Sequence, residues 1–126
     1  MGEAEQVERL CADGRCFVEL ACQYPDLPTD AAGKRIRARL SEARDAVFAV
    51  AEQARDSLAE QYRESRDPHK HLRQRPVRAS LVFSVKEEGR AYRITWHFRL
   101  SRGGRALAEK ENTARFDKQS GRILPK

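Results

Sequence analysis

The chain has 126 residues, of which 40% are hydrophobic and 35% are charged, and its formal net charge is +6. This length supports one core and predicts a single domain over residues 1–126. No stretch approaches the roughly 18 apolar residues that a membrane-spanning helix needs, so we expect no membrane partner. The first residues lack the basic and then apolar pattern of a secretory signal, which predicts a cytoplasmic location.

The two halves of the chain carry opposite charge. Residues 1–65 contain 9 Lys and Arg against 13 Asp and Glu, whereas residues 66–126 contain 16 against 6. The basic character therefore belongs to the C-terminal half alone. Such segregation indicates a surface that faces a polyanion, because summed charge steers association with nucleic acid or an acidic protein.

The first segment, residues 3–23, carries apolar or small side chains at steps of three and four between Val7 and Ala21. This spacing predicts an amphipathic helix. The prolines at positions 25 and 28 end it, and Thr29 or Asp30 is the expected cap of the helix that follows.

Three cysteines, Cys11, Cys16 and Cys22, lie in this first segment. An odd number on one predicted helix cannot form an intrachain set without a remainder, which indicates a reducing compartment. On a helix, Cys11 and Cys22 would share a face as small core residues. Their spacing is no recognised zinc pattern, so we expect no metal and no cofactor.

A second helix is expected from residue 30 to about residue 66. Its apolar stripe runs from Ile36 to Tyr62, and its first steps average 3.5 residues, the period of coiled coils. At 1.5 Å per residue it would be about 55 Å long, more than the first helix can cover. Either the sheet or the same helix of a second molecule would bury the excess, so a homodimer through the long helix is one expectation.

Alternating side chains mark the strands after this helix. Residues 68–76 form a basic linker bounded by prolines, and from residue 77 the apolar side chains recur with a period of two, which predicts strands separated by glycine-containing turns. Residues 106–116 combine helix-forming composition with a position between two turns, and we predict a strand there. The expected fold is α+β: an N-terminal helical hairpin with one long helix (residues 1–67) packed on a C-terminal antiparallel β-meander of three to four strands (residues 77–126).

The first predicted hairpin of this meander has one apolar face and one basic face. Trp96 and Phe98 lie on the apolar face, where we expect core residues; the alternative is an exposed platform on which single-stranded bases stack.

The opposite face, its turn and the preceding linker supply the arginines that we predict to bind nucleic acid: Arg73, Arg75, Arg78, Arg93, Arg99, Arg102 and Arg105. An acidic protein partner and a merely solvated surface are the alternatives for this basic face. The Gly103-Gly104 turn could also bring backbone N–H groups close to a phosphate, or be a plain tight turn.

Catalysis has little support in this sequence. It has no phosphate-binding G-x4-G-K-[ST] loop, no HExxH and no G-x-S-x-G motif. The basic half has no pair of carboxylates placed for catalysis beyond Glu109 and Glu111, and we expect these two to form ion pairs with neighbouring arginines. The chain is therefore predicted to have no catalytic residues and to be no enzyme.

One run of residues resembles a known family. Ile94, Trp96, Gly103, Gly104 and Arg105 match the I-x-W core and the glycine-basic turn of the MobI group of conjugative transfer proteins. The resemblance covers about a third of the chain, and it implies an accessory factor that helps a relaxase engage the transfer origin of a mobile element. The leading interpretation is thus a small accessory protein that binds nucleic acid, with DNA expected; the alternative is an adaptor or inhibitor that binds an acidic protein.

Overall fold

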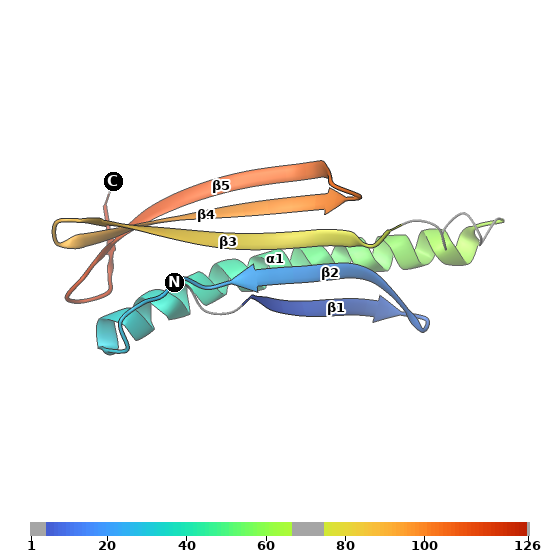
Figure 1. Ribbon diagram of the computed structural model, residues 1–126. Helices are drawn as coiled ribbons and strands as arrows, with labels where there is room; N and C mark the ends of the chain where they lie inside the picture. Colours follow the sequence, from blue (N-terminus) through green and yellow to red (C-terminus); the bar gives the residue numbers. More distant parts are fainter. Residues whose placement is uncertain (1–4, 67–74, 126) are drawn as a thin grey trace.

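The computed structural model describes residues 5–66 and 75–125, and their main element is a single mixed sheet (Figure 1). The elements in chain order are β1 (Gln6–Ala12), β2 (Arg15–Gln23), α1 (Ala31–Glu64), β3 (Val77–Glu88), β4 (Ala91–Arg102), β5 (Arg105–Asp117) and β6 (Ile123–Leu124). The strands lie in the sheet in their order along the chain. Neighbours are antiparallel except β2 and β3, which are parallel and are joined through α1.

The predicted N-terminal helix is wrong, because residues 6–23 form the antiparallel hairpin of β1 and β2. Asp13 and Gly14 have φ of 54° and 74°, the left-handed pair that closes a two-residue hairpin turn. The inward side chains Val18, Leu20 and Cys22 follow a period of two and are all buried. The predicted arrangement of a helical hairpin on a C-terminal meander is therefore replaced by two strands, one helix and four more strands.

A bulge explains why the β2 sequence imitates a helix. Leu10 pairs with Val18 and Cys11 with Cys16, so Phe17 has no partner of its own on β1. Phe17 and Val18 are both buried, and the Phe17 ring lies 6.0 Å from that of Tyr62 on α1. A bulge turns two consecutive side chains toward one face, and this breaks the alternation that would have marked a strand.

The cysteines also differ from the sequence-based expectation. Cys11 and Cys16 are opposite each other in the hairpin and form a disulfide, with a Cα–Cα distance of 3.8 Å. Cys22 is a buried free thiol, and burial raises its pKa. The three residues do not share a helix, so the inference of a reducing compartment from unpaired cysteines is lost.

The long helix is present and begins at the expected cap. The Asp30 side chain accepts a hydrogen bond from Gly33 N at 2.8 Å, which satisfies one of the free N–H groups of the first turn. A Cβ added to Gly33 would lie 1.7 Å from the Pro28 carbonyl oxygen, so the connection from β2 packs directly on the helix start. None of the helices in the part of the chain described is long and apolar enough to cross a membrane.

The helix covers one face of the sheet, which we call the inner face. Its stripe, with Ile36 and Leu40 at 0% and 1% exposed, packs chiefly against β2, β1 and β3 (Figure 1). Opposite it, Leu81 of β3 and Ile94 of β4 are buried on the same face. The apolar stripe of the long helix is thus buried by the sheet of the same chain, which was one of the two expected covers; the other was the helix of a second molecule.

The C-terminal strands follow the predicted pattern. β3 and β4 pair along their whole length, from Arg78 opposite Ser101 to Glu88 opposite Ala91. Residues 105–117 form β5, as predicted for the ambiguous stretch, and β6 pairs with β5 only at Arg115 and Phe116. Trp96 and Phe98 are on the inner face, but they are half-buried at the margin of the core.

Candidate nucleic-acid interface

The seven arginines predicted to bind nucleic acid separate into two groups. Arg73 lies outside the described residues. Arg78, Arg93 and Arg99 are on the outer face, the side of the sheet away from α1. Arg75 and Arg102 line a hollow at the end of the molecule that holds the β4–β5 turn, and Arg105 follows that turn.

Each arginine of the outer-face group has a carboxylate nearby. The pairs are Arg78 with Glu5 at 2.9 Å, Arg93 with Glu88 at 3.0 Å and Arg99 with Glu109 at 3.6 Å. Exposed pairs of this kind add little to stability, but they cancel the charge that a polyanion would meet. The expectation that Glu109 and Glu111 pair with neighbouring arginines is confirmed for Glu109, whereas Glu111 lies beside His97.

His97 extends this compensated pattern on β4. Its Nε2 atom lies 3.6 Å from Glu109, and its Nδ1 atom lies 3.6 Å from Glu111. Glu88 also approaches Arg115 at 3.8 Å, in addition to its contact with Arg93. The face that looked basic from β3 and β4 alone becomes mixed in charge once β5 is paired with it.

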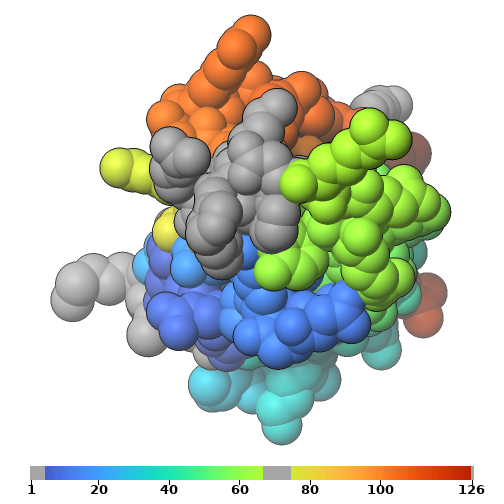
Figure 2. Space-filling model, turned by 90° about the vertical axis from the view of Figure 1, so that its right-hand side faces the viewer, coloured from blue at the N-terminus to red at the C-terminus, as the bar shows by residue number. Residues whose placement is uncertain are grey.

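The end of the molecule is different, because the residues that line its hollow, among those that the structure describes, include three arginines and no carboxylate. Figure 2 views this end, with the β4–β5 turn in orange, the end of α1 in green and the β1–β2 turn in blue. The hollow is lined by Arg15, Cys16, Phe17, Leu58, Arg75, Pro76 and Arg102. Arg15 was not among the predicted site residues.

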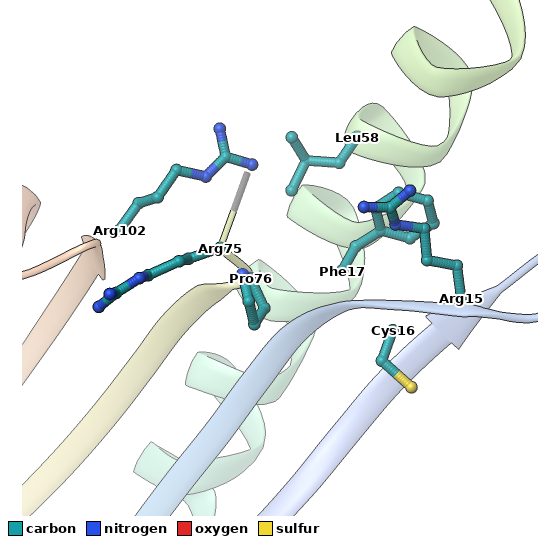
Figure 3. A pocket seen from close by; sticks show the side chains of 7 residues that line it. All are labelled: Arg15, Cys16, Phe17, Leu58, Arg75, Pro76 and Arg102. Atoms are coloured by element: carbon teal, nitrogen blue, oxygen red, sulfur yellow. The ribbon is translucent and has the colours of Figure 1, made fainter. Parts of the chain in front are cut away.

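The arginines are spread around this hollow. Figure 3 shows Arg15 beside the Phe17 ring on one side, and Arg75 and Arg102 on the other, with Leu58 of α1 between them and the Arg75 guanidinium pointing away from Arg15. The hollow itself measures only about 20 Å³, far below the roughly 300–1,000 Å³ of a site for an organic ligand. The arrangement suits an extended anion that crosses the surface better than a small molecule that enters it.

Two of these side chains, those of Arg15 and Arg102, are partly enclosed by their surroundings. The Arg15 guanidinium lies 5.2 Å from the Tyr62 ring centroid and 5.8 Å from that of Phe17, in cation–π contact with both. Arg102 Nε is shielded from solvent and has no hydrogen-bond partner among the residues that the structure describes. A shielded donor without an acceptor is costly, and an incoming phosphate oxygen would relieve that cost.

Sequence reasoning missed Arg15 for a specific reason. The assignment of residues 3–23 to a helix placed Arg15 far from the basic half of the chain. The Asp13-Gly14 dipeptide was the signal that could have corrected this, because it is a strong indicator of a hairpin turn. With a hairpin there, β2 pairs beside β3, and Arg15 comes to the end of the sheet from which Arg75 enters β3.

The Gly103-Gly104 turn has φ of 57° and 81°, so both glycines occupy the left-handed region. The Gly104 carbonyl oxygen accepts a hydrogen bond from Arg99 Nη2 at 3.2 Å. The glycines therefore allow the tight turn, and the bond to Arg99 ties it to β4. No group of three or more His, Cys, Asp or Glu within residues 5–66 and 75–125 is placed to hold a metal ion.

Comparison with known proteins gives little further information. No family model matches the sequence, and no curated protein matches it either. Among solved structures, the chain is similar to a DUF3298 family protein from Pseudomonas aeruginosa, with 14% sequence identity and a TM-score of 0.47. The match covers 98% of this chain and 52% of the other, so this chain spans about half the length of that protein.

Proposed function

We propose that the protein is a non-enzymatic accessory protein that binds nucleic acid, with DNA as the expected ligand. The observation that carries the proposal is the cluster of Arg15, Arg75 and Arg102 around the hollow at the end of the sheet. Arg105 belongs to the same surface, since it is opposite Arg102 in the register of β4 and β5. An accessory role in conjugative transfer, which the MobI resemblance implies, is one setting for this activity.

Charge and shape support this choice. Phosphate binding needs several cations on one surface, because each neutralised phosphate releases a condensed counterion. Among the described residues, the lining of this hollow contains no carboxylate, whereas Arg78, Arg93 and Arg99 each have one within 3.6 Å. The proposal therefore keeps Arg75, Arg102 and Arg105, adds Arg15, and treats Arg78, Arg93 and Arg99 as members of structural ion pairs.

The test is a fluorescence anisotropy titration of labelled DNA at two salt concentrations. Binding at low salt that weakens steeply at higher salt is the expected result, and Arg75→Gln should weaken it. Arg75 is exposed and precedes β3, so its replacement leaves the core intact. A lack of affinity at low salt, or an affinity that salt does not change, would overturn the proposal.

A protein partner is the second candidate, and the free edge of β5 favours it. Between Arg105 and Ala114, β5 pairs with β4 on one side. On its other side no described strand pairs with it there, because β6 reaches only Arg115 and Phe116. An unpaired edge of this length can accept a strand from another protein. Capture of an acidic protein by a strict monomer, with no binding to nucleic acid, would favour this alternative.

A homodimer and a cytoplasmic location stay proposals as well. The apolar stripe of α1 packs on the sheet, and Val50, at 43% exposed, is the large apolar side chain of α1 that remains open among the described residues. Dimerisation through α1 would thus use less apolar surface than the sequence suggested. The Cys11–Cys16 disulfide removes the argument that cysteine usage provided for the cytoplasm.

A further inference from the structure

The inner face of β4 and β5 carries a strip that α1 covers incompletely. Trp96, Phe98 and Leu100 lie along β4 on this face, and all three are half-buried. Their partners on β5 are Asn112, Lys110 and Ala108, and these are exposed. At about 3.4 Å per residue the strip runs roughly 20 Å, from Trp96 to the arginines at the end of the sheet.

The strip is open at its arginine end and closed at the other. Toward the start of β4, Ile94 is fully buried, and Phe116 of β5 is 1% exposed. The Lys118 Nζ atom lies over the Tyr92 ring, 5.2 Å from its centroid. Anything that lies along Trp96 and Phe98 can therefore extend in one direction, toward Arg102.

Charge on the strip has a single sign. Lys110 lies beside Phe98 in the register, and Arg102 and Arg105 are opposite each other where the strip ends. Glu109 and Glu111, the carboxylates of β5 nearest to Lys110, lie on the outer face opposite Arg99 and His97. The inner surface thus combines aromatic rings with unopposed cations, whereas the outer face combines cations with carboxylates.

The bordering flank of α1 is uncharged between Ala43 and Ser57. Ion pairs from Arg44 to Glu8 and from Arg63 to Asp13 place one flank of the helix against β1 and the β1–β2 turn. The other flank, at steps of three and four, contains Ala43, Val47, Val50, Ala54 and Ser57. The same steps continue through Gln61 to Glu64, so the uncharged part of this flank ends before the last turn of α1.

We propose that Trp96 and Phe98 form a stacking platform for the bases of single-stranded nucleic acid, with Lys110 and Arg102 on its phosphates. This inference rests on the proposed nucleic-acid binding, and it specifies that the nucleic acid is single-stranded. Aromatic rings interleaved with cations on one strand surface are the pattern by which proteins hold single strands. A duplex keeps the faces of its bases stacked on one another, so it has no free base face to place on these rings.

The protein contains a single tryptophan, so the fluorescence of Trp96 reports directly on the platform. An unlabelled oligo(dT) of about 12 nucleotides, within the range of known site sizes, is titrated at low salt and compared with a duplex of equal length. We expect the single strand to quench Trp96 with the same midpoint as an anisotropy titration, and the duplex to bind more weakly without quenching. Salt-dependent binding of the single strand without any change in Trp96 emission would overturn this inference and leave the proposed function standing. A lack of binding by either probe would overturn both.

Two variants and one control sharpen the test. Phe98→Leu keeps an apolar side chain and removes the ring, and it should lower the affinity for oligo(dT) about ten-fold, because base stacking contributes that much per ring. The Lys110 side chain is exposed, so Lys110→Gln should leave the fold intact. This substitution should also weaken binding of the single strand. Lys86→Gln removes an equally exposed lysine from the outer face and should leave the affinity unchanged. Equal effects of Lys110→Gln and Lys86→Gln would contradict the platform.

Discussion

The Nε atom of Arg99 lies 3.6 Å from Oε1 of Glu109, its register partner across β4 and β5. Arg102 lies three residues further along the same strand. The Nε atoms of both arginines are shielded and lack a hydrogen-bond partner among the described residues, but only Arg99 also has a carboxylate at ion-pair distance there. One strand therefore presents a neutralised arginine on its outer face and an unneutralised one at its end.

This contrast predicts different effects for two matched substitutions. Arg102→Gln should weaken DNA binding and lower the slope of log affinity against log salt by about 1, because one phosphate contact is lost. Arg99→Gln removes the same charge from an ion pair and should leave that slope unchanged. Anisotropy titrations over a series of salt concentrations measure both slopes, and a larger loss for Arg99→Gln would contradict the assignment.

Gly121 and Gly89 offer a matched test of packing near the C-terminus. Both have positive φ, 73° and 60°, so alanine strains the backbone at either site by about 1–2 kcal/mol. A Cβ at Gly121 would lie 2.4 Å from the Ala32 carbonyl oxygen, whereas a Cβ at Gly89 meets nothing within 4 Å. Gly121→Ala should therefore lower the unfolding free energy by about 1–3 kcal/mol more than Gly89→Ala does. Urea denaturation of both variants measures the difference, and equal losses would argue against contact between this turn and the start of α1.

The cysteine arrangement predicts a thiol count. The chain has three cysteines, and with Cys11 joined to Cys16 only Cys22 remains free. Thiol titration of the oxidised, unfolded protein should give one reactive group per chain, and three after reduction. Replacing both Cys11 and Cys16 with serine should lower the unfolding free energy by about 2 kcal/mol, since the closed loop is short. A count of three before reduction would show that the disulfide is not formed.

Asp117 predicts a pH dependence at the β5–β6 turn. Hydrogen bonds from the Ser120 hydroxyl and from Ser120 N, at 2.9 Å, hold the pKa of Asp117 below its ordinary value. A carboxyl whose pKa is lower in the folded state contributes stability above its unfolded pKa, and this stability is lost as the pH falls through the folded pKa. The wild type should thus be more stable than Asp117→Asn at pH 7. Chemical denaturation at a series of pH values should show that this advantage shrinks below about pH 4, and an advantage that grows on acidification would contradict the assignment.

The C-terminal strands were predictable because one of their faces is buried. Ala79, Leu81 and Phe83 of β3 are buried and alternate with Arg78, Ser80, Val82 and Ser84, which are mostly polar, and this period of two specifies a strand. The long helix was predictable for the equivalent reason, a continuous stripe and the Asp30 cap. The N-terminal hairpin was not, because the bulge at Phe17 gives the segment a helix-like spacing.

The candidate site depended on pairings that no local pattern specifies. Arg15 and Arg75 are 60 positions apart, and they approach only because β2 and β3 are parallel neighbours across α1. The mixed charge of the outer face likewise depends on the register that sets Glu109 opposite Arg99. Charge counts along the sequence could identify a basic half, but not which of its arginines meet a carboxylate.

The most direct test of the account is an NMR titration with DNA that follows the side-chain Nε–Hε signals of the arginines. We expect the signals of Arg15, Arg75, Arg102 and Arg105 to shift at low salt, while those of Arg78, Arg93 and Arg99 stay in place. Shifts confined to Arg78, Arg93 and Arg99 would contradict it and return the binding surface to the outer face.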